Sequence, residues 1–162
     1  MSVPTRRQIA SRSEFQEAVR RSLGEAAASG AKEIVLCDRD FADWPLGEPA
    51  VIESLVRWAG PHRRLSLLAH GYDELARRHG RWTQWRRQWS HLVTCRSNDE
   101  VDAMELPTIC LVPGVVSVRL FDAVHHRGIE SHEAVDEVTC REAVDALLQR
   151  STEAFPATTL GL

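Results

Sequence analysis

The sequence predicts one α/β domain built on a mixed, largely parallel sheet that helices flank on both faces. A β-hairpin and a closing helix are expected at its C-terminal end. The chain has 162 residues, which is enough for one buried core and short for two. Hydrophobic residues make up 43% and charged residues 27%, as is typical of a globular protein. Short apolar runs alternate with amphipathic segments, which favours strands and helices in alternation.

The first two predicted elements are a helix and a strand. Residues 13–29 place their apolar side chains on one helical stripe, with Ser13 and Gln16 spaced as a capping box and Gly30 as a stop. Residues 33–37, EIVLC, are apolar and mostly branched, and a polar segment follows them. This pattern predicts a buried strand that ends in a loop.

The alternation continues through the middle of the chain. The predicted elements are a helix from Pro49 to Ala59, a strand at 64–69, a helical region at 72–89 with a break at Gly80, and a strand at 91–96. Strands separated by helices indicate parallel pairing, because the chain must cross over between them.

The pattern changes after residue 107. The predicted elements are strands at 108–112 and 115–121 around a Pro113-Gly114 turn, a last strand at 133–138, and a closing helix whose capping box is Thr139 and Glu142. The domain is therefore expected to span 11–155, between flexible tails at 1–10 and 156–162.

Composition bounds the location and the partners. No segment approaches the roughly 18 apolar residues of a membrane span, and the first residues contain no apolar leader core. The four cysteines are scattered, without a CxxC pair: Cys37, Cys95, Cys110 and Cys140. They are typical of reduced, buried thiols, so we expect a cytoplasmic protein with no membrane partner.

Two carboxylates follow the first predicted strand. Asp38 and Asp40 lie at its carboxyl end, where open α/β sheets bind ligands, and together they could hold magnesium. The segment resembles the first motif of haloacid dehalogenase-like phosphatases, which implies a magnesium-dependent phosphatase as an alternative function. Lys32, the only lysine, precedes the strand and does not occupy that family's lysine position. A solvated turn is the favoured interpretation of these aspartates.

Three histidines cluster near the predicted hairpin. His125, His126 and His132 could supply nitrogen ligands to zinc, but adjacent histidines on a strand point in opposite directions. No carboxylate or cysteine completes a known ligand spacing. A polar loop is favoured, and we expect neither a metal nor a cofactor.

Arginine and tryptophan alternate between residues 77 and 89. The residues are Arg77, Arg78, Arg81, Trp82, Trp85, Arg86, Arg87 and Trp89. They could serve phosphate contacts and base stacking, which makes nucleic-acid binding a second alternative. The helical spacing of the tryptophans favours core packing with arginines on the wet face. The net charge of −3 also argues against a nucleic-acid partner.

From residue 33 to residue 150 the order of elements resembles one half-domain of the phospholipase D superfamily. Active members carry HxKx4DG on the hairpin, where the histidine attacks phosphorus and the lysine grips phosphate oxygens. Here Leu106, Thr108 and Pro113 stand at the histidine, lysine and aspartate positions, and only Gly114 of the turn is kept. The resemblance implies a chain without phosphohistidine chemistry and, since two halves pair in that family, a homodimer.

The sequence therefore predicts a domain without catalytic residues that acts as a binding, regulatory or assembly module. Its expected partners are a second copy of the chain and an anionic ligand or a protein. The candidate ligand-binding residues are Asp38, Asp40, Arg77, Arg78, Arg81, His125 and His126.

Overall fold

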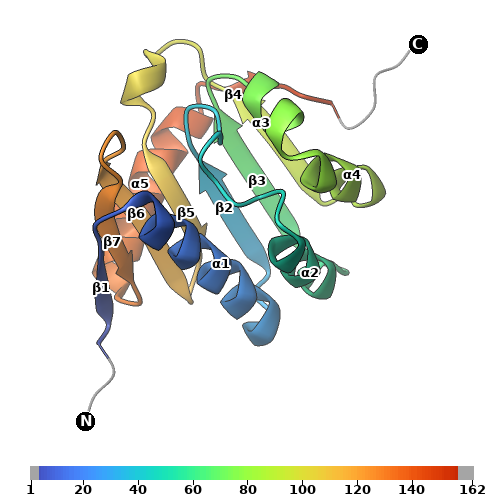
Figure 1. Cartoon of the computed structure of the whole chain (residues 1–162). Coiled ribbons are helices and arrows are strands. Elements are labelled where there is room, and N and C mark those ends of the chain that lie inside the picture. Colours follow the sequence, from blue (N-terminus) through green and yellow to red (C-terminus); the bar gives the residue numbers. More distant parts are fainter. Residues whose placement is uncertain (1–3, 157–162) are drawn as a thin grey trace.

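The computed structural model describes residues 4–156, which form one eight-stranded sheet with helices on both sides (Figure 1). The strands are β1 (Arg6–Ile9), β2 (Glu33–Cys37), β3 (Arg64–Ala69), β4 (Val93–Ser97), β5 (Thr108–Val112), β6 (Val116–Asp122), β7 (Arg127–Ser131) and β8 (Thr152–Glu153). The helices are α1 (Arg12–Ser29), α2 (Pro49–Trp58), α3 (Asp73–Arg78), α4 (Gly80–Gln88) and α5 (Ala134–Leu148), with a 3-10 turn at Ala103–Glu105.

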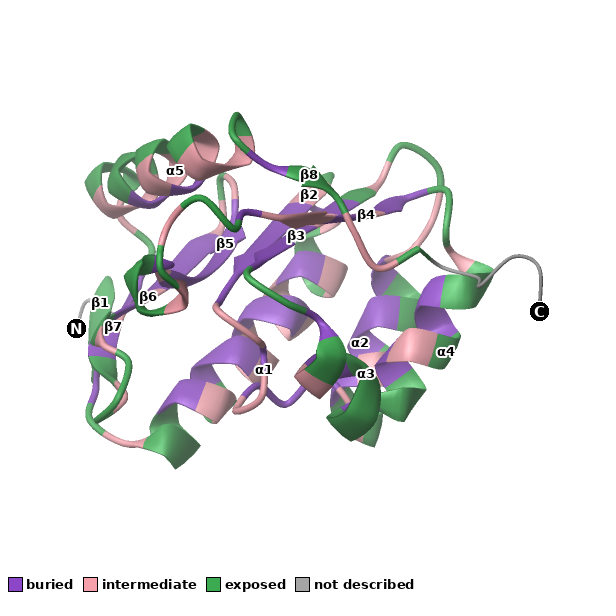
Figure 2. Cartoon of the chain, turned by 90° about the horizontal axis from the view of Figure 1, so that it is seen from above, coloured by how far each residue is buried: buried purple, intermediate pink, exposed green. Residues whose placement is uncertain are grey.

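The sheet separates two apolar layers of different size. Helices α1 to α4 lie on one face and α5 lies on the other, as the view along the strands shows (Figure 2). The larger layer includes Phe15 of α1, Trp58 of α2 and Trp82 of α4, each at most 1% exposed. The smaller layer joins Cys140 and Val144 of α5 to the opposite side of the sheet. Helices on both faces confirm the predicted fold class.

The sheet is mixed, in the order β1-β7-β6-β5-β2-β3-β4-β8. Strands β2, β3 and β4 are parallel neighbours, as the alternating segments predicted. The other five ladders are antiparallel, because the β5–β6 hairpin, β7 and β1 all extend the sheet on the other side of β2 and β8 adds to β4. The parallel part is thus smaller than predicted.

The N-terminal segment differs from the expected flexible tail. Residues 6–9 form the edge strand β1, which pairs antiparallel with β7 and buries Ile9 at 1% exposure. Helix α1 also begins earlier than predicted. Ser11 accepts a hydrogen bond from the Glu14 amide, and the Glu14 carboxylate accepts one from the Ala10 amide, so the capping box is Ser11 and Glu14 rather than Ser13 and Gln16. Residues 1–3 and 157–162 of the expected tails lie outside the described part.

The predicted last strand at 133–138 is wrong. Those residues form the first turns of α5, and the strand lies earlier, at β7. Asp136 accepts hydrogen bonds from Arg6 and Ser131, which fixes the start of the helix against β1 and β7. Thr139 donates to the Val135 carbonyl within the helix, so it does not cap the helix N-terminus.

The β5–β6 hairpin is confirmed, with its turn at Gly114 (φ +79°). All four cysteines are buried and free, as expected. Among residues 4–156, no helix has both the length and the apolar character to cross a membrane.

Candidate functional site at the carboxyl edge of the sheet

The parallel strands β2, β3 and β4 end at one edge of the sheet, and antiparallel β5 begins there. We call this edge, with the loops 38–48, 70–72 and 98–107, the carboxyl edge. Cys37 at the end of β2 pairs with Ile109 at the start of β5, so the residues just beyond them, Asp38 and Thr108, face each other. This is where ligands bind in open α/β sheets.

Asp38 is buried, at 8% exposure, and its carboxylate is fully engaged. Its Oδ1 accepts the Thr108 hydroxyl at 2.6 Å, and its Oδ2 accepts the amides of Phe41 at 2.8 Å and Asp40 at 3.3 Å. Phe41 takes a positive φ of 60° in this turn. Burial raises the pKa of Asp38 above its usual range, against the opposing effect of the three hydrogen bonds.

The space around Asp38 is small. A cavity of about 20 Å³ lies between Asp38, Asp40, Thr108 and His126. A single water molecule needs roughly 10–15 Å³ of such space, so a phosphate group does not fit without movement.

Asp40 and His126 border this cavity but have other partners. The Asp40 carboxylate accepts the Ala42 amide at 3.0 Å, and His126 Nε2 lies 3.4 Å from Asp43. His125 points elsewhere and contacts Asp122 at 2.8 Å, which holds the pKa of Asp122 below its usual range. The structure thus brings Asp38, Asp40 and His126 together and separates His125 from them.

The third histidine belongs to a different cluster. His132, Glu25 and Glu130 lie close enough for a common metal ion, and they form the metal-compatible group found among the described residues. The Arg21 guanidinium already contacts Glu130 at 2.6 Å, so this carboxylate is neutralised by a cation of the chain itself. Neither Asp38 nor Asp40 belongs to this group.

The predicted arginines of α3 and α4 lie away from the cavity. Arg77 and Arg78 both bind the Glu74 carboxylate, at 2.5 and 2.6 Å, and an Arg81 nitrogen lies 3.3 Å from the Gly47 carbonyl. Trp82 and Trp85 are buried, which confirms core packing and leaves their rings unable to stack on bases.

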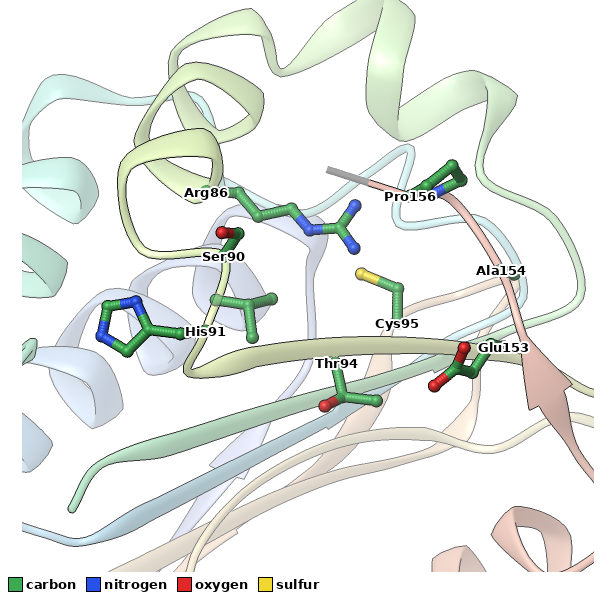
Figure 3. Close-up of a pocket in the computed structure, with 9 residues that line it drawn as sticks. Arg86, Ser90, His91, Thr94, Cys95, Glu153, Ala154 and Pro156 are labelled. Atoms are coloured by element: carbon green, nitrogen blue, oxygen red, sulfur yellow. The ribbon is translucent and has the colours of Figure 1, made fainter. Parts of the chain in front are cut away.

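The expectation that all the arginines of 77–89 face solvent is wrong for Arg86. Its side chain is 5% exposed, donates to the Phe155 carbonyl and lies over the Phe155 ring at 5.0 Å. Figure 3 shows its guanidinium directed toward the C-terminal segment, near Cys95. Arg86 therefore anchors that segment.

Sequence reasoning did not predict that Thr108 contacts Asp38 or that Asp43 contacts His126. Thr108 and Asp38 are 70 positions apart, and no local pattern links them. The antiparallel approach of β5 to β2 creates the contact.

No protein-family model and no curated protein matches the sequence. Several solved structures match the fold, among them the two described next. The chain superposes on TrmBL2, an archaeal chromatin protein with a novel mode of DNA binding, with a TM-score of 0.65 and 13% identity over 95% of this chain and 55% of the TrmBL2 chain. It superposes on NucT from Helicobacter pylori with a TM-score of 0.59 and 6% identity, covering 92% of this chain and 98% of that one. The chain therefore shares the α/β fold of these two structures. The chain spans about half the length of the TrmBL2 chain.

Replacing Asp38 with asparagine should remove a pH dependence of stability. Folding raises the pKa of Asp38. As the pH falls, the folded state therefore takes up a proton at a higher pH than the unfolded state does. The contribution of Asp38 to the free energy of unfolding therefore falls as pH rises from below its unfolded pKa to above its folded pKa. Asparagine can keep one acceptor for the two amides and donate to Thr108, without a charge to desolvate.

Urea denaturation of wild type and Asp38→Asn across pH 4 to 8 measures this difference. We expect the variant to gain stability relative to wild type toward pH 8. Parallel curves for the two proteins would show that Asp38 carries no shifted pKa.

Proposed function

We propose that this domain is a non-catalytic, phospholipase D-like module that binds or assembles. The observation that carries the proposal is that buried side chains occupy the carboxyl edge and leave a cavity of only about 20 Å³. At the positions that resemble the family's histidine and lysine, Leu106 and Thr108 are 5% and 4% exposed. Leucine has no nucleophilic atom, and the Thr108 hydroxyl is occupied by Asp38.

The charge of the carboxyl edge supports the same conclusion. The loop before β5 exposes four carboxylates: Asp99, Glu100, Asp102 and Glu105. Arg39 is a basic residue that contacts this loop, and its guanidinium lies 2.7 Å from the Met104 sulfur. A field of this sign repels a phosphodiester, so the edge is unsuited to the substrates of active members.

A hydrolysis panel tests this proposal. Bis(p-nitrophenyl) phosphate probes phosphodiester cleavage, and p-nitrophenyl phosphate with Mg²⁺ probes the phosphatase alternative at Asp38 and Asp40. We expect wild type to match the protein-free blank with both compounds, because the cavity holds about one water and offers no nucleophile.

Thr108→Val and Asp38→Asn serve as matched variants. Turnover in wild type that either substitution abolishes, in a protein that still shows a native circular dichroism spectrum, would overturn the proposal. Turnover that both variants retain, and that follows the protein through purification, would place a site elsewhere on the chain and would also overturn the proposal.

The proposal includes assembly as a homodimer. Its support is the sequence resemblance to a family in which two halves pair about a twofold axis. Sedimentation equilibrium tests it, and a mass of one chain at micromolar concentration would contradict it.

A further inference from the structure

Exposed acidic and basic side chains gather at opposite ends of the parallel strands. Opposite the acidic carboxyl edge, the parallel strands begin at an edge where basic side chains gather. We call this set the amino-edge surface, and it consists of Lys32, Arg57, His62, Arg63, Arg64 and His91. The net charge of −3 for the whole chain hides this separation.

The starts of three neighbouring strands place part of this surface in a row. The Arg64 amide donates to the Lys32 carbonyl at 2.9 Å, and the next amide along β3, that of Leu65, donates to the Leu92 carbonyl at 2.9 Å. In the strand register Arg64 pairs with Glu33 and Leu65 with Val93, so Lys32 and His91 lie one and two positions before these partners, at the same edge as Arg64. Adjacent strands lie about 4.8 Å apart, so the row extends roughly 10 Å across the sheet.

The end of α2 extends the row on the helical side. Trp58, the last residue of α2, donates its indole N–H to the Ala31 carbonyl, which ties the helix end to the start of β2. Arg57 lies in this last turn, and Arg63 donates to the Trp58 carbonyl at 3.1 Å. His62, in the loop between α2 and β3, is exposed and takes a positive φ of 61°.

The neighbouring carboxylates do not balance these cations. Glu53 pairs with Arg57 at 3.4 Å, and Glu33 contacts Arg64 at 3.7 Å. Glu33 also binds Arg141 of α5 at 2.9 Å, so a second arginine shares its charge. Within residues 4–156, Lys32 and Arg63 have no carboxylate within ion-pair distance. The surface keeps a positive excess.

Stabilisation of helix ends accounts for part of this pattern. Basic residues near a helix C-terminus interact favourably with its carbonyl groups, which explains Arg57 and Arg63. Lys32 follows the C-terminus of α1 and shares this explanation, whereas Arg64 begins β3 and adjoins no helix end.

We propose that the amino-edge surface binds the phosphate backbone of duplex DNA. The Arg57 and Arg64 side chains are 57% and 68% exposed, so a small anion would bind them weakly through water. A polyanion gains from counterion release, and this gain accumulates over several open contacts. The acidic carboxyl edge repels the same duplex, which leaves the basic edge as the face presented to it. The proposal does not depend on whether the carboxyl edge is catalytic.

Fluorescence anisotropy with a labelled 20-base-pair duplex tests the proposal over a series from 20 to 200 mM salt. The test variant is Lys32→Gln/Arg64→Gln. The matched control is Arg77→Gln/Arg78→Gln, which removes the same charge from α3. We expect the test variant to bind about tenfold more weakly at 50 mM salt, with the slope of log K against log salt reduced by about 2. The control should stay within about threefold of wild type.

Each other outcome overturns the assignment. Equal losses in both variants would indicate a response to overall charge, and a loss confined to the control would place DNA on α3 and α4. Absence of wild-type binding at 20 mM salt removes the proposal, as does binding to vesicles with 30% phosphatidylserine without binding to DNA. Thermal melting of each variant shows that the fold is kept.

Discussion

Replacing Gly128 with alanine should lower the free energy of unfolding by about 4 kcal/mol or more, because the sheet has no space for the added methyl group. Gly128 lies in β7 between Leu120 of β6 and Ile9 of β1. A Cβ at this position would overlap the Arg119 carbonyl oxygen and lie 2.7 Å from the Leu120 Cα. Both obstacles are backbone atoms of a neighbouring strand, which cannot turn aside as the tip of a side chain can.

Gly60→Ala provides the matched control. An added Cβ at Gly60 meets no atom within 4 Å, so we expect a change within about 0.5 kcal/mol. Thermal and urea denaturation measure both variants. For a chain of this length, 4 kcal/mol corresponds to a fall in Tm of roughly 8–16 °C. A Gly128→Ala protein within 1 kcal/mol of wild type would mean that β6 and β7 can separate at little cost.

The buried strands could be predicted from sequence because each is a short apolar run. The strands at 33–37, 64–69 and 108–112 match β2, β3 and β5. Strand β1 gave no such signal. Three of its four residues are exposed, since it pairs with β7 on one side and, within residues 4–156, with no strand on the other. A strand held by one neighbour has no need of an apolar run, and its pairing depends on residues more than 100 positions away.

The start of α5 was ambiguous for a physical reason. In the segment 133–138, Ala134, Val135 and Val138 fit both a short strand and a helix. The structure exposes Val135 and Val138 and buries Cys140 and Val144 instead. The apolar residues that face the sheet pack on strands far away in the sequence, and the Asp136 contact with Arg6, across 130 positions, lies beside them.

The candidate site shows the same limit. Sequence reasoning located Asp38 at the end of a buried strand, and the structure places it there. The buried carboxylate accepts a hydrogen bond from Thr108, a residue at the start of β5. The segregation of charge between the two edges was also hidden, because Lys32, Arg64 and His91 come to one edge of the sheet only when three strands align.

Replacing Arg21 with methionine should lower the free energy of unfolding by about 3 kcal/mol, because it leaves a buried carboxylate without its cation. Glu130 of β7 is 3% exposed, and the Arg21 guanidinium contacts it through Nη2 at 2.6 Å and Nε at 3.2 Å. The Arg21 side chain is 30% exposed, so water reaches one end of the pair and keeps the cost at the lower end of the range for buried ion pairs.

Two further variants distinguish the loss of the buried ion pair from the loss of one arginine charge. Arg57→Met removes an arginine from an exposed pair with Glu53, and we expect it to cost less than about 0.5 kcal/mol. Arg21→Met/Glu130→Leu removes both buried charges, and it should recover most of the loss because an apolar pair needs no desolvation of ions.

Urea denaturation of the single and double variants gives the coupling energy of the pair. Arg21→Met no worse than Arg57→Met would mean that Glu130 finds another partner, for which His132, in the same cluster, is the nearest candidate. A large coupling would identify the Arg21–Glu130 contact as the polar link that fixes α1 of the larger layer to β7 in the antiparallel part of the sheet. A cation entering this cluster would then have to displace Arg21 from the carboxylate it neutralises.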